Sequence, residues 1–160
     1  MRLRAPAEVR ERVPGERVLA WAPSGTSTVV ATEDALVLPN GSGGDRVPWD
    51  LVLRVSWEQG GFELVSQPRP GAPAATVLVP VPEPGALPGV IKERVNASIV
   101  VARHVPLADD GGARIVARRT PGSSELRWSV VFDPGLDPRD PALRAAADEA
   151  LAALRGSLGV

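Results

Sequence analysis

Four arginines on predicted strands of the C-terminal half are the strongest candidates for binding chemistry. Arg114 and Arg118 alternate onto one face of a predicted strand, Arg127 lies on the following strand, and Arg103 lies on the preceding one. If the strands pair in register, the four guanidinium groups share one sheet face. Such a face could bind a phosphate group, a nucleic-acid backbone or an acidic protein surface. The alternative is a solvated face on which Glu125 pairs with an arginine.

Three aspartates in a proline-rich segment near the C-terminus are candidates for a metal site. Asp133, Asp137 and Asp140 would supply the carboxylate oxygens that calcium prefers. The favoured interpretation is structural: Asp133 and Asp137 precede prolines and would form Asx turns, and Asp140 would cap the helix that follows. The sequence therefore assigns no metal site, and it indicates no cofactor.

Catalysis through cysteine or tyrosine is excluded, because the chain contains neither residue, and its one histidine is His104. His104 shares a predicted strand face with Val100 and Ala102, and no serine lies in a Gly-x-Ser-x-Gly sequence. We interpret His104 as a structural or surface residue rather than a catalytic base. The sequence therefore assigns no catalytic residue, and an enzyme is the less favoured class.

The glycine-rich run Gly41-Ser42-Gly43-Gly44 has the composition of a phosphate-binding loop. Such a loop needs a helix N-terminus and usually a lysine directly after it, whereas Asp45 and a predicted strand follow here. We therefore predict a flexible hairpin loop.

The overall composition is that of a one-domain chain with little net charge. Its 160 residues correspond to about one domain, and 18 basic against 19 acidic side chains give a net charge of -1. This balance gives no strong nucleic-acid signal. No apolar run is long enough for a transmembrane segment, and the charges between Arg2 and Arg17 leave no room for a signal-peptide core. We expect a cytoplasmic protein. Lys92 is its one lysine among 18 basic residues, a bias typical of high-GC bacterial genomes.

The elements that must position these residues are mostly short β-branched runs separated by turn residues. Strands are predicted over residues 17–22, 27–32, 35–39, 51–57, 62–66, 75–81, 98–107, 113–120 and 125–133. A short helix is predicted over residues 90–97. A C-terminal amphipathic helix is predicted over residues 140–156, with Asp140 as N-cap, Pro141 in the first turn and an apolar stripe that includes Leu151 and Leu154.

This element order favours an α+β fold, mostly an antiparallel β sandwich or partly open barrel with a short middle helix and a C-terminal helix. We expect a single domain over residues 1–160. It would comprise an N-terminal arm (1–15), a first β unit (16–81), a β meander (98–133) and the C-terminal helix (140–156). Three tryptophans on apolar strand faces, Trp21, Trp57 and Trp128, are predicted to be buried, and Trp49 is predicted to be more exposed.

Three short motifs between residues 14 and 57 suggest a family. They are Pro14-Gly15-Glu16 before the first strand, the turn Ala31-Thr32-Glu33-Asp34, and Arg46-Val47-Pro48-Trp49-Asp50 leading into the strand at 51–57. Together they resemble the bacterial pleckstrin-homology-like domains. The resemblance implies strongly bent sheets closed by a C-terminal helix, which residues 141–158 would supply.

The same resemblance raises the question of lipid binding. Eukaryotic relatives of these domains bind phosphoinositides through basic residues around the loop after the first strand. The corresponding loop here, residues 22–27, contains no basic residue. Phosphoinositide binding is therefore not expected.

The sequence favours a non-catalytic binding or scaffold module that mediates protein association, either with another protein or with itself through sheet edges. The alternative is a small enzyme or ligand-binding barrel that uses carboxylates in a pocket. A buried carboxylate with a raised pKa would favour this alternative.

Overall fold

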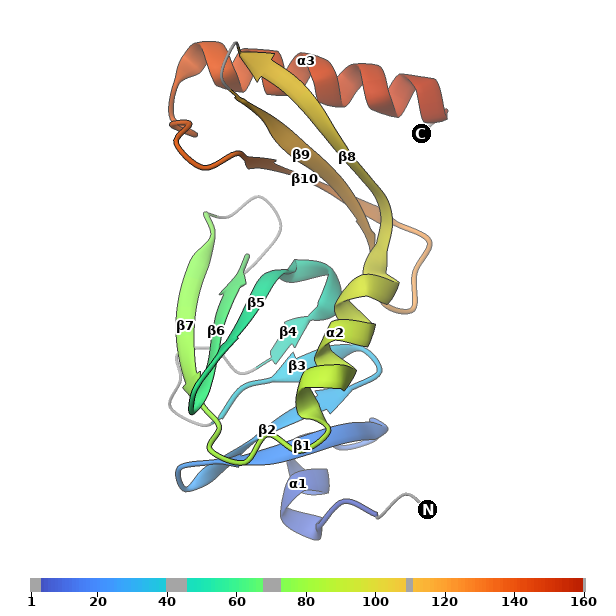
Figure 1. Cartoon of the computed structure of the whole chain (residues 1–160). Coiled ribbons are helices and arrows are strands. Elements are labelled where there is room, and N and C mark those ends of the chain that lie inside the picture. The colour runs from blue at the N-terminus through green and yellow to red at the C-terminus, as the bar shows by residue number, and fades with distance from the viewer. Residues whose placement is uncertain (1–3, 40–45, 68–72, 109–110, 160) are drawn as a thin grey trace. The chain divides into compact units, whose positions relative to one another are not determined.

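The computed structural model describes residues 4–39, 46–67, 73–108 and 111–159 (Figure 1). The chain divides into two compact units, Met1–Ser98 with Thr120–Glu125 (unit 1) and Ile99–Arg119 with Leu126–Val160 (unit 2). None of the described helices has both the length and the apolar character that a membrane span requires. The expectation of a single domain stays a prediction.

Unit 1 contains two antiparallel sheets whose strands follow one another along the chain. The first sheet consists of β1 (Val18–Ser24), β2 (Ser27–Thr32), β3 (Ala35–Val37) and β4 (Arg46–Pro48). A single 3-10 turn, η1 (Trp49–Leu51), leads into the second sheet. That sheet consists of β5 (Val52–Glu58), β6 (Gly61–Ser66) and β7 (Ala75–Pro80).

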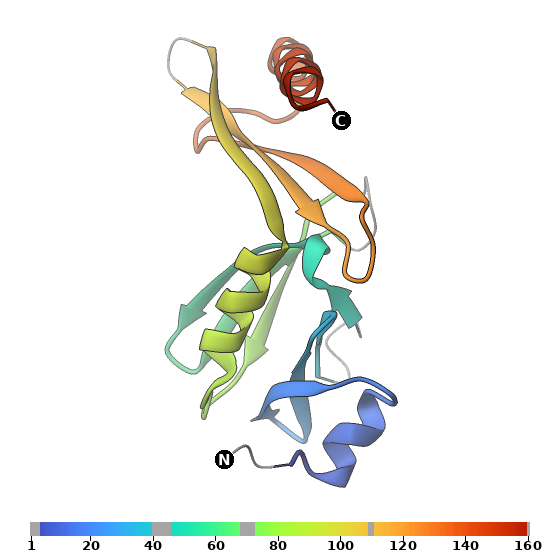
Figure 2. The ribbon, with the colours of Figure 1, turned by 90° about the vertical axis from the view of Figure 1, so that its right-hand side faces the viewer.

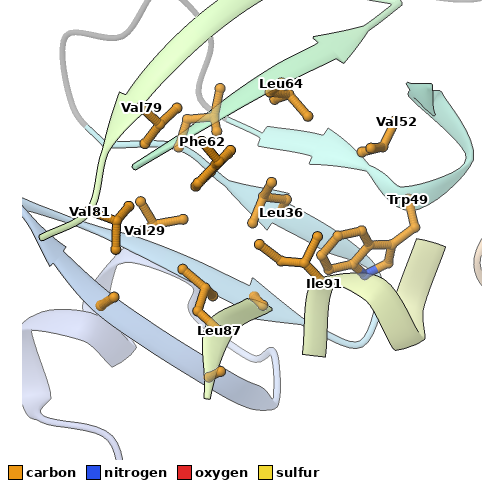
Figure 3. Packing of buried hydrophobic residues seen from close by; sticks show 14 residues of the cluster. Val29, Leu36, Trp49, Val52, Phe62, Leu64, Val79, Val81, Leu87 and Ile91 are labelled. Carbon is orange, nitrogen blue, oxygen red and sulfur yellow. The ribbon is translucent and has the colours of Figure 1, made fainter. Parts of the chain in front are cut away.

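The main core of unit 1 is formed by apolar side chains from both sheets and from α2 (Leu87–Ser98). Figure 3 shows Leu36, Trp49 and Ile91 pointing into it from three different elements. Trp49 is only 1% exposed, and its indole N–H donates to the carbonyl oxygen of Thr32 at 3.0 Å. The predicted exposure of Trp49 was wrong because its ring packs into the main core, where Thr32 of β2 accepts the indole N–H. The other three tryptophans are only partly buried, contrary to expectation.

A second, smaller cluster covers the other face of the first sheet. The short helix α1 (Ala7–Arg12) buries Val9 against Val30 and Val37. The Arg12 side chain donates to backbone carbonyls of Thr28 and Leu38, which ties α1 to the sheet. Because both faces are covered, the second half of β2 is buried at every position.

The longer helix of unit 1, α2, packs on its sheets from the side of the main core. It contacts β1, β2 and η1, and its Leu87 and Ile91 are fully buried in the main core. The resemblance to pleckstrin-homology-like domains gives the closing role to the C-terminal helix, which belongs to unit 2. That role stays a prediction.

Unit 2 is a three-stranded antiparallel sheet and one long helix, α3 (Pro141–Leu158). The strands are β8 (Ile99–Ala108), β9 (Gly111–Arg119) and β10 (Leu126–Phe132), with β9 in the middle. The Asp140 side chain caps α3 by accepting from the N–H of Ala142 at 2.9 Å, as predicted. Within this unit α3 lies over one face of the sheet (Figure 2). Arg155 of α3 lies 5.8 Å from the Trp128 ring on that face.

The α+β class, the antiparallel pairing, the middle helix and the C-terminal helix are confirmed. The described strands form three separate sheets, none of them closed into a barrel. The short elements β4 and η1 were not predicted. The predicted loop at 41–44 lies outside the described residues.

Candidate binding groove

A groove of about 460 Å³ lies between β5 and α2, entirely within unit 1. Figure 1 shows α2 running beside this strand. Its volume falls within the range typical of ligand sites, roughly 300–1,000 Å³. The groove is open to solvent along one side, and most of its lining is apolar. The lining residues are Val55, Trp57, Pro88, Gly89, Ile91, Lys92, Val95 and Asn96.

The helical wall of the groove is one face of α2. Pro88, Ile91, Val95 and their neighbours recur at the three- and four-residue spacing that aligns side chains along a helix. Leu87 and Ile91 anchor this helix in the main core. The wall is therefore fixed by core packing rather than by surface contacts.

The strand wall of the groove is the inner face of β5. Val55 pairs with the buried Leu64 of β6, and Trp57 pairs with the buried Phe62. The rings of Trp57 and Phe62 lie 4.8 Å apart between centroids at an interplanar angle of 49°, a favourable tilted arrangement. This contact holds the Trp57 ring at the groove wall.

The polar part of the groove is small and carries one charge. Lys92 is the one lysine of the chain, and Asn96 lies one helical turn further on. Among the described residues Lys92 makes no salt bridge. The next two helix residues, Glu93 and Arg94, pair with each other at 3.0 Å and line a different cleft beside β1. The groove can therefore hold an apolar group whose polar end is neutral or negative.

The four arginines predicted to share one sheet face do not do so. The β9 residues Arg114 and Arg118 share a face, and Arg127 of β10 lies directly opposite Arg118. Arg103 pairs with the buried Ile115, which places it on the opposite face of the sheet. The β8–β9 register decides this, because a shift of one residue reverses the face of every side chain on a strand.

The exposure of these arginines differs as well. Arg114 is exposed, whereas Arg118 is only 5% exposed and donates to the hydroxyl of Ser129 at 3.4 Å. A four-arginine patch is therefore not formed. Partner binding by Arg103, Arg114, Arg118 or Arg127 stays a prediction.

His104 has a carboxylate partner that the sequence did not reveal. Its Nε2 atom lies 2.9 Å and 3.0 Å from the two carboxylate oxygens of Asp133, at the end of β10. The same carboxylate accepts from the backbone N–H of Gly112 at 2.8 Å. The hydrogen bond from His104, followed by that from Gly112, lowers the pKa of Asp133 below its usual 3.8.

The three aspartates considered for calcium have separate structural roles. Asp137 accepts from the N–H of Arg139 at 2.9 Å in the predicted Asx turn, and Asp140 caps α3. The Asx turn predicted for Asp133 was wrong, because its carboxylate bonds to His104 and Gly112 instead.

Comparison with known proteins adds no identification. No family model, curated protein or solved structure matches this chain. The assignment of function therefore depends on the geometry described above.

Sequence reasoning missed the groove although it identified both walls. Trp57 was predicted on an apolar strand face, which Val55 shares by alternation, and Ile91 and Val95 lie four residues apart in the predicted helix at 90–97. Such patterns normally indicate core. Whether these residues line a groove or a closed core depends on where β5 lies in its sheet. It lies at the edge, and strand order cannot be read from the sequence.

Proposed function

We propose that the chain is a non-catalytic binding module that mediates protein association through the groove between β5 and α2. Its occupant is an apolar segment of a partner protein. The observation that carries this proposal is an apolar, solvent-open groove whose walls pack on the main core. Its lining contains a cation, Lys92, that makes no salt bridge with any residue the structure describes. Such grooves fit a protein segment because apolar side chains supply affinity and a few polar groups fix orientation.

The resemblance to bacterial pleckstrin-homology-like domains is part of this proposal. It is supported by the two sheets of unit 1 and by a helix, α2, that follows the last strand and packs on them. In this interpretation unit 2 is an addition to the pleckstrin-homology-like part.

The enzyme alternative receives less support. A buried carboxylate with a raised pKa would favour it, whereas the pKa of Asp133 is lowered. No Asp or Glu lines the groove in the part of the chain described.

Two glycines in open space, one in the groove and one outside it, offer a matched pair of variants for testing the proposal. A side chain added at Gly89 enters the groove, and a Cβ atom there would meet nothing within 4 Å. Gly156 in α3 is equally open but lies in unit 2. Both Gly89→Leu and Gly156→Leu should fold, because leucine is favoured over glycine in a helix by about 1 kcal/mol.

The test is photo-crosslinking in cells of the native host, with a photoreactive phenylalanine analogue at the exposed position Asn96. We expect a discrete protein adduct that Gly89→Leu abolishes and Gly156→Leu leaves unchanged. The proposal is overturned if position 96 yields no protein adduct, or if the adduct survives Gly89→Leu. Thermal melting of each variant checks that the fold is intact.

A further inference from the structure

We infer that the occupant of the groove is an extended peptide that adds as a strand to the open edge of β5 and presents an acidic side chain to Lys92. This inference rests on the proposed function and specifies the chemistry of the partner. It follows from three observations: the free edge of β5, the direction of its backbone groups, and the charge of the groove.

The first observation is strand order. In the sheet β5-β6-β7, β5 pairs with β6 and with no other described strand. An edge strand presents a row of N–H and C=O groups that can pair with another chain. Natural edges are commonly protected by bulges or charges. On β5 the register shift between Val52 and Arg54 and the charge of Arg54 protect its first half, whereas the segment Val55–Trp57 carries neither device.

The second observation concerns where the backbone groups of β5 point. Glu58 and Gly61 flank a two-residue turn, in which Gly60 has a φ of 90°. The pair beside such a turn is hydrogen-bonded, and pairs then alternate along an antiparallel ladder. Ser56 therefore turns its N–H and C=O toward β6, whereas Val55 and Trp57 turn theirs toward the open edge.

The same two residues, Val55 and Trp57, form part of the open edge and part of the groove lining. Val55 and Trp57 offer backbone groups in the plane of the sheet and side chains on its inner face, toward α2. Alternate side chains of a strand paired with this edge would enter the groove. A helical occupant would leave the edge groups of β5 unpaired, so an extended occupant satisfies more of the site.

The third observation is charge. Lys92 is the one charged residue in the groove lining, and it has no salt-bridge partner among the described residues. An aspartate or glutamate on the added strand would supply that partner. Exposed ion pairs contribute little affinity, so the carboxylate selects among sequences, while the backbone and the apolar side chains supply most of the binding.

The experiment uses the full chain to select from a displayed library of random peptides about as long as β5, which has seven residues. We expect peptides with alternating apolar and polar residues and at least one acidic residue. A synthetic copy should lose about tenfold in affinity when one edge-facing amide is N-methylated, because a net hydrogen bond is worth about that factor. Hydrogen exchange of the Val55 and Trp57 amides should slow on binding.

Charge variants test the acidic preference. Lys92→Glu should weaken the selected peptide roughly fivefold, and Arg144→Glu on α3 should not, although it changes the net charge equally. Equal effects of the two variants would remove the role of Lys92 from the proposal.

The outcomes separate this inference from the proposed function. One outcome is that selected peptides lose binding to Gly89→Leu but tolerate N-methylation. This outcome would overturn strand addition and leave the proposed groove function standing. Selected peptides whose apolar residues have helical spacing would also overturn strand addition alone. So would a crosslinked protein partner confirmed in the host when the library yields no peptide. Selected peptides that bind Gly89→Leu normally would count against both.

Discussion

The two units of this chain stabilise their sheets by different means. In unit 1 the first sheet is covered on both faces, by the main core on one side and by α1 on the other. Among the described residues of unit 2 a single helix packs on one face, and half of the buried apolar side chains are the alanines Ala113, Ala117 and Ala147. Alanine removes little apolar area from water, so each such residue contributes less than a buried leucine or tryptophan.

This difference bears on where a binding site can be precise. A site holds its geometry when its side chains stand on elements fixed by their own packing. The groove between β5 and α2 meets this condition, because both walls rest on the main core of unit 1. Perturbing each unit separately tests how large the difference is.

The largest effect is expected in the core of unit 1. Trp49→Ala should lower the free energy of unfolding by about 3–5 kcal/mol, because it removes a fully buried ring and leaves a cavity. Trp128→Ala in unit 2 should cost less, because Trp128 is only partly buried. Urea unfolding followed by circular dichroism measures both. Equal losses would show that the two units are packed to a similar degree.

In unit 2 the contribution of α3 depends on a few leucines. Leu154→Ala should cost about 2–3 kcal/mol, since its side chain is nearly buried at 9% exposure. Leu151→Ala should cost less, because Leu151 is only partly buried. Thermal melts rank the two variants. A larger loss for Leu151 would mean that α3 packs through a different face.

Close backbone contacts offer a comparison that does not depend on core size. A Cβ atom at Gly61 would lie 2.2 Å from the carbonyl oxygen of Val79, and one at Gly112 would lie 2.1 Å from that of Val105. Gly61→Ala in unit 1 and Gly112→Ala in unit 2 should therefore each cost about 1–3 kcal/mol. Gly156→Ala, in open space on α3, should instead stabilise by up to about 1 kcal/mol. Chemical denaturation measures the free energy of unfolding of the three variants. An unchanged value for Gly112→Ala would contradict the expected clash in unit 2.

Much of the secondary structure could be predicted because its signals are local. Alternation located β2 at residues 27–32 without error, and Asp140 and Pro141 located the start of α3. The prediction that Trp49 is exposed was wrong for a physical reason. Flanking Pro48 and Asp50 favoured exposure, yet the ring lies in the main core, where Thr32, distant in sequence, accepts the indole N–H.

The candidate sites were harder to predict because they depend on pairing. Alternation placed Arg114 and Arg118 on one face of β9 correctly, since that requires only one strand. The face of Arg103 depends on the register between β8 and β9, which includes two irregularities. Predicting the groove requires knowledge of the strand order. Predicting the His104–Asp133 pair requires knowing that residues 29 positions apart meet. None of these is encoded in a local pattern.

The smallest expected effect is a pH dependence confined to unit 2. Asp133 closes the end of the β9–β10 ladder: its N–H donates to the carbonyl oxygen of Gly112, and its carboxylate accepts the Gly112 N–H. Hydrogen bonds from His104 and Gly112 lower the folded-state pKa of Asp133 below the usual 3.8. The stabilisation is therefore fully present above about pH 4, the unfolded-state pKa, and is lost as pH falls through the lower folded-state value.

A carboxyl-carbon NMR titration of Asp133 measures this shift directly. In His104→Ala the pKa of Asp133 should rise toward 3.8, because the largest cause of its lowering is removed. Glu149→Gln, on an exposed position of α3, serves as a control that changes a charge without touching the pair. Since both side chains of the pair are partly exposed, salt should reduce the charge contribution but leave most of the hydrogen-bond contribution. An Asp133 titration that is the same in wild type and His104→Ala would mean that the pair does not persist in solution, and that the backbone of Gly112 alone holds this end of the sheet.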